Sequence, residues 1–452
     1  MKVFMLGWEF PPYISGGLGT ACAGLTRGLN EAGVEVAFVL PMALPHDASS
    51  HVTFRTPTTL MQPGRRTTGK AGQAKKGDRP EAARPGVTMH VLPAILQPYG
   101  TPAGYEQAMK KLEELRKQGL SDVAELLGAS GMPAELFAGI GPGGYGGDLM
   151  GQVSRYASLA VRLASNETFD VIHAHDWMTY PAGLATSAYT GKPLVVHVHS
   201  TEFDRSGENV NQEVYNIERA GMHGAERVVC VSYLTRSIVL SRYGVPAEKV
   251  QVIYNAVEPP TDREVQLSPI RRDEKIVLFL GRITMQKGPE YFLLAAKKVL
   301  DKFKKVRFVI AGSGDMIAEA IEMAAELGIG RYVTFTGFLR GDDVARVFQM
   351  ADLYVMPSVS EPFGIAPLEA LSHNVPVIIS KQSGVSEVLT HVLKVDFWDV
   401  DEMANKILAV LRHPPLQRVL RQQGQIELQK LSWRDSAEQC KKMYEDLVRA
   451  SA

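Results

Sequence analysis

Two glutamates, Glu361 and Glu369, lie eight residues apart on either side of a glycine-containing turn that leads into a helix. Glu361 is expected in the loop, where its carboxylate can accept hydrogen bonds from sugar hydroxyls. Glu369 is expected on the helix, where it can accept from both hydroxyls of a ribose. Between them, the backbone amides of Gly364, Ile365 and Ala366 would face a phosphate. A helix cap with a surface glutamate is the alternative interpretation.

Two cations open the second half of the chain. Arg282 directly follows Gly281 and an apolar strand at 276–280, and Lys287 comes five residues after Arg282. A strand end can bring both cations to one point, which suits a pyrophosphate leaving group whose negative charge grows as its bond to the sugar breaks. Two solvent-facing cations are the alternative.

A glycine-rich loop follows the first apolar strand. Gly16 and Gly17 stand at the start of a helix, where backbone N–H groups and the helix dipole can hold a phosphate. The loop has neither the P-loop spacing nor the dinucleotide-binding spacing, and such loops also serve simply to turn the chain. A phosphate site and a plain turn therefore both remain open on this segment.

Histidines stand at the ends of two further apolar strands. His175 and Asp176 end one strand, and His197 and His199 end another, at the edge where α/β sheets bind ligands. A single histidine at such a place is often a buried or loop residue instead. No pattern of carboxylates accompanies these imidazoles, so we expect no metal.

Apolar periodicity predicts a β-α-β unit at the start of the chain, with strands at 2–7 and 34–40 around a helix at 20–32. Further strands are expected at 171–175, 194–199, 227–231 and 250–253, and helices at 105–128, 148–166 and 178–190. The rhythm restarts with strands at 275–280, 306–311, 332–336, 353–356 and 375–379, and with helices at 289–303, 315–327 and 365–373.

Two such series predict an α/β fold of two Rossmann-like, doubly wound domains that face each other across a cleft. The expected organisation is an N-terminal domain over 1–258 with a variable insertion at about 42–140, a hinge over 259–272, a C-terminal domain over 273–430, and a terminal helix at 431–452 that can pack back on the N-terminal domain.

Composition indicates a globular protein. Of 452 residues, 45% are hydrophobic and 22% are charged, and 49 Lys and Arg balance 49 Asp and Glu, so no overall charge attracts nucleic acid or a membrane. The stretch 61–86 carries seven basic against two acidic residues and is expected to be solvated; a tether for polysaccharide or RNA is the alternative. The oligomeric state stays open.

The three cysteines and the hydropathy of the chain bear on its compartment. Cys22, Cys230 and Cys440 are scattered and suit buried thiols in a reducing compartment. The first residues indicate a strand rather than a signal peptide. No apolar stretch approaches the roughly 20 residues that span a bilayer. We therefore expect a cytoplasmic protein without membrane insertion.

The order of these motifs resembles the retaining glycosyltransferases of GT-B fold, in particular family 4 and its glycogen and starch synthase relatives. The resemblance rests on Gly16–Gly17, His175–Asp176, the pair Arg282 and Lys287, and the pair Glu361 and Glu369. It spans almost the whole chain apart from about 42–140. It implies that the C-terminal domain binds a nucleotide sugar and that the N-terminal domain lies on the acceptor side.

The resemblance also implies roles around the sugar and its diphosphate. His175 would contact the donor hexose near its reacting carbon, and Gly17 would touch the diphosphate. Arg282 and Lys287 would neutralise that diphosphate as it departs, while Glu361 would bind the sugar hydroxyls. The anomeric configuration would be kept without a metal or other cofactor. A diphosphate oxygen would take the proton of an acceptor that attacks from the side of the leaving group.

Further positions are assigned in the same way. Glu369 would bind the ribose, Phe338 would hold the base, and Asn255, near the junction of the two domains, would touch the sugar. Asp176 and His199 are placed at the acceptor side. The roles of Phe338 and Asn255 are implied by the resemblance alone.

The resemblance favours a glycogen-synthase-like hexosyltransferase that moves glucose to an α-glucan or oligosaccharide. The segments 8–12 and 199–203 carry this preference. Bacterial glycogen and starch synthases have a lysine where Ile14 stands, so both ADP-glucose and UDP-glucose remain open as donors. Alternatives are transfer to a small-molecule or lipid-linked acceptor, an epimerase or phosphorylase of the same fold, and an inactive module that binds nucleotide sugar or glycan.

Overall fold

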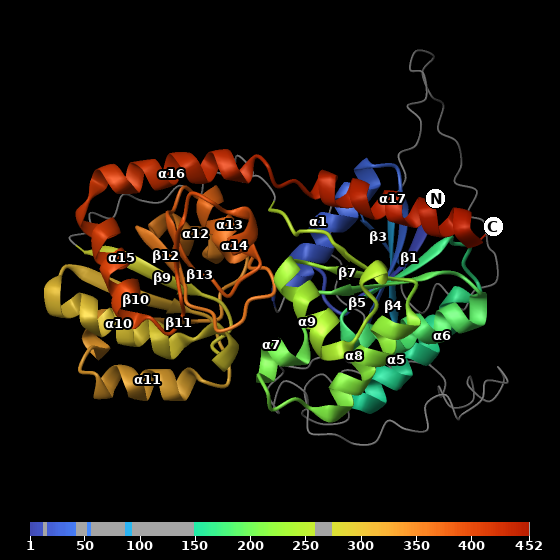
Figure 1. The fold of residues 1–452 in the computed structure, drawn as a ribbon, viewed down its shortest axis with the longest axis horizontal. Helices are drawn as coiled ribbons and strands as arrows, with labels where there is room; N and C mark the ends of the chain where they lie inside the picture. Colours follow the sequence, from blue (N-terminus) through green and yellow to red (C-terminus); the bar gives the residue numbers. More distant parts are fainter. Residues whose placement is uncertain (12–15, 42–51, 56–85, 93–148, 258–273, 452) are drawn as a thin grey trace, which may run out of the picture.

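A computed structural model describes residues 1–11, 16–41, 52–55, 86–92, 149–257 and 274–451, which form two α/β domains (Figure 1). Several sequence predictions lie outside the described residues: Ile14, nearly all of the basic stretch 61–86, the helix at 105–128 and the hinge at 259–272.

The N-terminal domain contains a fully parallel sheet of eight strands in the order β3-β4-β2-β1-β5-β6-β7-β8. The strands are β1 (Lys2–Leu6), β2 (Glu35–Pro41), β3 (Val52–Arg55), β4 (Val87–Leu92), β5 (Val171–His175), β6 (Leu194–Val198), β7 (Arg227–Cys230) and β8 (Val250–Val252). The helices are α1 (Gly17–Glu31), α5 (Leu149–Ala164), α6 (Tyr180–Thr190), α7 (Glu202–Ser206), α8 (Gln212–Gly224) and α9 (Tyr233–Tyr243).

Both faces of this sheet are buried, as β1 illustrates. Val3 and Met5 point into one hydrophobic cluster, and Phe4 and Leu6 point into another on the opposite face. A strand that is buried on both faces reads as a continuous apolar run, which is why periodicity placed this strand correctly.

The strands β3 and β4 correct the sequence analysis, which treated the region from 42 to 140 as a variable insertion. Instead, β4 pairs in parallel with β2, and β3 pairs with β4, so this region contributes the edge of the sheet. The four residues of β3 are too few to give a periodic signal, and only the pairing with β4 makes them a strand.

The C-terminal domain holds a second parallel sheet, of six strands in the order β11-β10-β9-β12-β13-β14. The strands are β9 (Lys275–Leu280), β10 (Val306–Ala311), β11 (Val333–Gly337), β12 (Leu353–Met356), β13 (Val377–Ser380) and β14 (Leu393–Val395). The helices are η4 (Met285–Lys287), α10 (Pro289–Lys302), α11 (Ile317–Glu326), α12 (Asp342–Met350), α13 (Ala366–Ser372), α14 (Val385–Val388), α15 (Val400–Arg412) and α16 (Pro414–Leu428). The predicted fold of two doubly wound domains is confirmed.

The chain returns to the N-terminal domain at its end. Helix α16 lies over the C-terminal domain, and α17 (Trp433–Ser451) continues across to lie along α1 (Figure 1). Two glycines of α1 make room for it, because a Cβ on Gly24 would stand 2.2 Å from the Trp433 ring and one on Gly28 would stand 2.4 Å from the Trp433 carbonyl oxygen. Cys22 of α1 and Cys440 of α17 are buried free thiols, as is Cys230.

Hydrogen bonds tie the two domains together beside the cleft. Glu387 of α14 accepts hydrogen bonds from the backbone N–H groups of Tyr233 and Leu234, at 2.9 and 2.7 Å, at the start of α9. Ser232 donates to the carbonyl oxygen of Pro362 at 2.6 Å. The domains therefore meet through polar contacts that can be exchanged, as well as through apolar packing.

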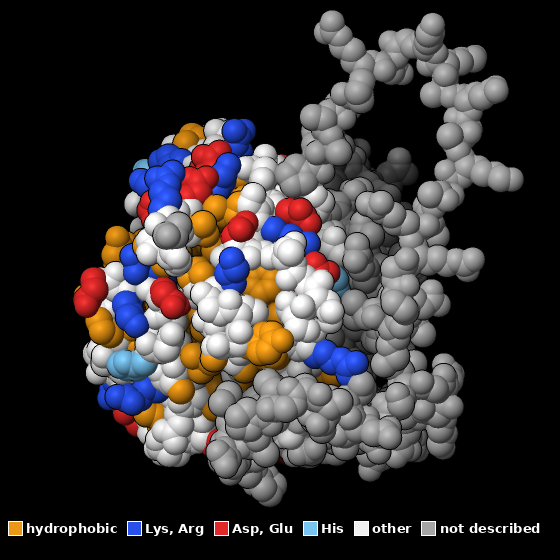
Figure 2. Space-filling view, turned by 90° about the vertical axis from the view of Figure 1, so that its right-hand side faces the viewer, with side chains coloured by type: hydrophobic (Ala, Val, Ile, Leu, Met, Phe, Trp, Pro, Cys, Tyr) orange, Lys and Arg blue, Asp and Glu red, His pale blue; other side chains and the backbone are white. Residues whose placement is uncertain are grey.

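On the end of the N-terminal domain shown in Figure 2, positive and negative side chains are interspersed among the described residues. This mixture agrees with the balanced composition of the chain. Within the described part of the chain, none of the helices combines the length and the apolar character required to cross a bilayer.

Candidate active site

A cleft of about 850 Å³ lies between the domains, where the carboxyl ends of strands from both sheets face each other. This edge is where parallel α/β sheets bind ligands. The sequence-predicted residues that line it are Gly16, Gly17, Asp176, His199, Asn255, Arg282, Lys287, Phe338, Glu361, Gly364, Ile365, Ala366 and Glu369. Of the predicted site residues, only His175 does not line the cleft.

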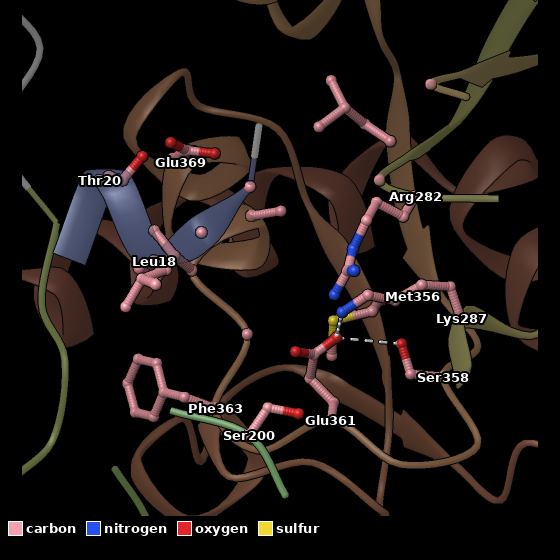
Figure 3. A pocket seen from close by; sticks show the side chains of 18 of the residues that line it. Leu18, Thr20, Ser200, Arg282, Lys287, Met356, Ser358, Glu361, Phe363 and Glu369 are labelled. Atoms are coloured by element: carbon pink, nitrogen blue, oxygen red, sulfur yellow. Dashed lines mark hydrogen bonds and ion pairs between the residues drawn. The ribbon is translucent and has the colours of Figure 1, made fainter. Parts of the chain in front are cut away.

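A carboxylate and an ammonium group meet on the C-terminal wall. Lys287 Nζ lies 2.5 Å from Glu361 Oε2, and the Ser358 hydroxyl donates to the same oxygen at 3.2 Å. Among the described residues, no hydrogen bond reaches the other carboxylate oxygen, Oε1. The Arg282 side chain extends towards the same point (Figure 3). The predicted convergence of two cations at a strand end therefore has a carboxylate at its centre.

Local structure explains this arrangement. Arg282 follows β9 immediately, and the short helix η4 brings Lys287 back beside the strand end. Glu361 follows β12 and is held by its backbone, since its N–H donates to the Gln382 carbonyl oxygen at 2.9 Å. Ser358 was missed by sequence reasoning, although it stands three residues before Glu361 in the same loop.

Glu369 lies in the first turn of α13 and lines the cleft, half-buried. Burial raises the pKa of its carboxyl from an ordinary 4.5 to about 7. The backbone of Gly364, Ile365 and Ala366 runs between Glu361 and Glu369 along the same wall.

An aromatic ring stands further along this wall. Phe338 follows β11, is 44% exposed, and has the Arg340 guanidinium 5.3 Å from its ring centre. An exposed ring in a cleft offers a flat apolar face on which a base can stack.

The N-terminal wall begins at α1. A Cβ on Gly17 would meet nothing within 4 Å, so the glycine leaves open space on the cleft side. The buried carboxylate of Glu9 accepts a hydrogen bond from the Gly19 N–H at 3.3 Å. Glu9 therefore caps the helix from within the cleft, a role that sequence reasoning missed although Glu9 follows β1 closely.

Asp176 connects the ends of β5 and β6. Its Oδ1 accepts hydrogen bonds from the backbone N–H groups of His199 and Ser200, at 2.8 and 3.3 Å. Its backbone adopts φ 61°, a region that few residues other than glycine, asparagine and aspartate enter. Burial raises the pKa of the Asp176 carboxyl to about 7. Asp176 therefore fixes the loop that carries His199.

The imidazole that reaches the cleft is that of His199. His175 is fully buried behind it, and the Nδ1 of His175 lies 2.9 Å from the Nε2 of His199. Direct contact between His175 and a bound hexose stays a prediction. Burial lowers the pKa of His199 to about 3 and holds that of His175 well below its usual range, so both rings are neutral at pH 7.

Three buried histidines raise the question of a metal. His173, His175 and His197 each place one ring atom within 4.8 Å of the others. Their rings are stacked, however, with the planes of His173 and His197 only 6° apart. Lone pairs lie in the ring plane, so those of stacked rings run side by side and do not converge on one ion. These residues do not fit a metal in this arrangement.

Two more residues of the N-terminal domain complete the wall. Asn255 is almost fully buried and lines the cleft where the domains meet. Arg205 also lines the cleft, and its guanidinium donates to Glu202 at 3.0 Å and to Glu218. The charge of Arg205 is thus balanced from within the domain. Sequence reasoning missed Arg205 because its partners are up to 13 residues away.

Two Rossmann-like domains that face each other across a cleft, with cations and carboxylates at the strand ends, define the GT-B class of glycosyltransferases. Three sequence families match consecutive parts of the chain: the starch synthase catalytic domain over 2–117, glycosyltransferase family 4 over 129–260 and glycosyl transferases group 1 over 261–427. The resemblance to family 4 glycosyltransferases and their glycogen and starch synthase relatives is confirmed, since glycosyltransferase family models match most of the chain.

Individual relatives agree with this assignment. An uncharacterized glycosyltransferase of Methanocaldococcus jannaschii is 29% identical over 405 residues, which cover 86% of this chain and 83% of the relative. Glycogen synthase of Mycobacterium tuberculosis is 22% identical over 400 residues, which cover 86% of this chain and 80% of the relative. Sucrose-phosphate synthase from Thermosynechococcus elongatus has the same fold, with a TM-score of 0.68 at 20% identity over the whole of both chains.

Proposed function

We propose that this glycosyltransferase transfers glucose from ADP-glucose or UDP-glucose to a hydroxyl of an α-glucan or oligosaccharide, with retention of the anomeric configuration. The observation that carries the proposal is the cluster of Arg282, Lys287 and Glu361 on one wall of the cleft, opposite His199 on the other. This cluster combines groups for a sugar and groups for a departing diphosphate in one site.

The cationic pair acts on the leaving group. As the bond between the anomeric carbon and the diphosphate breaks, negative charge develops on the diphosphate oxygens. Arg282 and Lys287 stabilise that charge in a site from which the closing walls exclude water. Because the negative charge on the diphosphate grows as the bond breaks, these cations stabilise the transition state more than the ground state.

Glu361 serves the sugar. Its Oε2 is engaged by Lys287 and Ser358, which leaves Oε1 to accept hydrogen bonds from hexose hydroxyls. The shared oxygen also links the two parts of the donor, because Lys287 contacts both Glu361 and the diphosphate. Sugar orientation and leaving-group stabilisation are thereby coupled through one ammonium group.

The remaining donor contacts follow the cleft wall. Glu369 accepts from the ribose hydroxyls, Phe338 stacks on the base, and Asn255 touches the sugar from the domain junction. Gly16 and Gly17 approach the diphosphate from α1. The acceptor enters from the side of Asp176 and His199, and a diphosphate oxygen takes its proton, so the new bond forms on the face that the leaving group vacates.

No metal or other cofactor takes part in this proposal, because the charge of the diphosphate is met by Arg282 and Lys287. The three buried free thiols favour the cytoplasm as the compartment. Transfer to a small-molecule or lipid-linked acceptor is the alternative, since the cleft residues named here act on the donor in either case.

A donor screen tests the proposal. The protein is incubated with ADP-glucose, UDP-glucose, GDP-glucose and UDP-N-acetylglucosamine, each with and without maltotriose. Release of nucleoside diphosphate and chromatographic extension of maltotriose are measured, and NMR of the product gives the anomeric configuration. Extension with an α-linkage supports the proposal. Turnover of none of these donors would end it, and tight calorimetric binding without turnover would point to an inactive module.

A further inference from the structure

Four histidine rings form a stack on the face of the N-terminal sheet that α17 covers. His173 and His175 of β5 lie 4.4 Å apart between ring centres, His175 and His197 lie 5.1 Å apart, and His197 and His199 lie 4.2 Å apart. The register of the sheet brings them together, since His175 is the direct parallel partner of His197. Only His199 lines the cleft.

Contacts with α17 and β2 hold the buried end of this histidine stack in place. Tyr444 of α17 shares a hydrogen bond of 2.5 Å with His173 Nδ1. The ring of His173 in turn stacks on that of His175, and Phe38 packs on His175 with 6.5 Å between ring centres. The His175 carbonyl oxygen accepts from the Thr179 hydroxyl at 2.9 Å. The plane of the His175 ring is therefore set by packing before any ligand arrives.

The two nitrogens of His175 have different surroundings. Nδ1 faces His199 Nε2 at 2.9 Å, whereas Nε2 is buried and has no hydrogen-bond partner among the described residues. A neutral imidazole carries one proton, and a buried N–H without an acceptor forfeits a hydrogen bond. The proton of His175 is therefore better placed on Nδ1, where His199 can accept it.

We infer that His175 is a positioning residue that donates a hydrogen bond from Nδ1 to Nε2 of His199, so that His199 carries its own proton on Nδ1 and meets the substrate as a donor. This inference rests on the proposed function and adds to it the reason why a fully buried histidine matters for the reaction. His199 then recognises a sugar oxygen that accepts a hydrogen bond, and His175 fixes both the tautomer and the ring orientation.

The electrostatic setting supports a neutral pair. Burial lowers the pKa of both rings, and the neighbouring imidazoles lower that of His175 further. A neutral pair needs one donor and one acceptor, so the tautomer of one ring dictates that of the other. The fixed N–H of His199 then lies in the wall before the sugar binds, which is the condition for preorganised catalysis.

Two substitutions at position 175 separate hydrogen bonding from packing. His175→Asn places a carboxamide group near the position of Nδ1 and keeps a donor, while His175→Leu removes it. We expect His175→Leu to lower kcat/KM for transfer from ADP-glucose or UDP-glucose to maltotriose by about tenfold or more, and His175→Asn to remain within about threefold of wild type. Equal losses in both variants would overturn the inference.

His197→Leu is the matched control. His197 is as buried as His175 and stacks on the same rings, but its ring nitrogens make no hydrogen bond to a described residue. The two leucine variants are compared at matched folded fractions by thermal unfolding. A loss of kcat/KM in His197→Leu as large as that in His175→Leu would show that packing alone is responsible, and would overturn the inference.

NMR gives a readout that does not depend on turnover. In protein labelled with ¹⁵N-histidine, long-range ¹H–¹⁵N correlations distinguish Nδ1–H from Nε2–H. The variants at 175 and 197 assign their own signals, and loss of a signal in His199→Gln assigns that of His199. We expect wild-type His199 to be protonated on Nδ1, and His175→Leu to lose this preference. Protonation of wild-type His199 on Nε2 would overturn the inference, as would a stoichiometric metal bound by these histidines in elemental analysis. If no donor is turned over, the proposed function fails, while the tautomer is still decided.

Discussion

The C-terminal wall of the cleft carries charged side chains that line it directly, whereas the N-terminal wall carries the imidazole of His199, backed by a buried stack of three other imidazoles. Lys287 and Glu361 lie within hydrogen-bonding distance of each other, and both side chains line the cleft. On the opposite side, burial lowers the pKa of His199 to about 3, so its imidazole is neutral at pH 7, and the charge of Arg205 is balanced by Glu202 and Glu218.

This difference separates two tasks. In the proposed function, Arg282 and Lys287 stabilise the diphosphate on the C-terminal wall. On the N-terminal wall the charge of Arg205 is balanced by Glu202 and Glu218, so the neutral His199 can orient hydroxyls there without a competing anion site. Fixed charge would then serve the leaving group, and fixed hydrogen bonding would serve the sugar and the acceptor.

The largest effect is expected from the charged wall. Lys287→Met should lower kcat by about 10² to 10³-fold, or about 2.7 to 4 kcal/mol, since it removes one electrostatic stabiliser of the leaving group. Steady-state kinetics with the donor identified by the screen measure this. Lys298→Met on α10 is the control, because Lys298 pairs with Asp401 on the surface at 2.7 Å. Activity of Lys287→Met within about twofold of wild type would contradict the assignment.

Substitutions of Asp176 test the hydrogen bonds that shape the N-terminal wall. Asp176→Ala leaves the N–H groups of His199 and Ser200 without their acceptor and should lower the free energy of unfolding by about 1 to 3 kcal/mol in urea titrations. Asp176→Asn keeps an oxygen acceptor and tolerates the positive φ, so its stability should stay close to that of wild type. If the two variants were equally stable, Asp176 would not hold the loop.

The pH dependence of the donor KM tests the proposed contact between Glu369 and the ribose. Burial raises the pKa of the Glu369 carboxyl to about 7, so the carboxylate predominates above pH 7 and the neutral acid below it. Because only the carboxylate accepts from both ribose hydroxyls, donor KM should rise by about tenfold as pH falls from 8 to 6. Glu369→Gln cannot titrate and should remove this dependence. A KM that rises equally in the variant would assign the titration to another group.

The smallest effect is expected at the contact between the domains. Glu387→Ala removes the acceptor for two backbone N–H groups at the start of α9 and should lower the free energy of unfolding by about 1 kcal/mol. Glu387→Gln keeps an oxygen acceptor and should lose less. Chemical denaturation measures both.

We also expect the two domains to close around the bound donor. Small-angle scattering with donor and maltotriose should then show compaction, and an unchanged radius of gyration would count against closure.

The two walls differ in how much of them the sequence could predict. Arg282, Lys287 and Glu361 each follow a recognisable strand within a few residues, and Glu369 lies in the first turn of the helix that comes next, so local pattern alone brings them to one sheet edge. The fold could be predicted from the sequence for the same reason, because strands such as β1 and β9 are apolar on both faces. Boundaries differ from the predicted ones by only a few residues.

The histidine wall depends on tertiary structure. The sequence shows His175 and His199 at strand ends, but only the pairing of β5 with β6 reveals which of them faces the cleft. The contact between Tyr444 and His173 joins residues 271 positions apart, and no local pattern contains it. The strands β3 and β4 escaped prediction because their identity comes from pairing, of β4 with β2 and of β3 with β4, rather than from their own periodicity.

The return of α17 to the N-terminal domain has a consequence for biosynthesis. Trp433 packs against Gly24 and Gly28, and Tyr444 is buried beneath the sheet that the first residues of the chain begin. A ribosome makes the start of the chain first, but the N-terminal domain lacks part of its core until the last residues have been made. The C-terminal sheet has all its strands earlier, so it can fold while its neighbour still waits for its final helix.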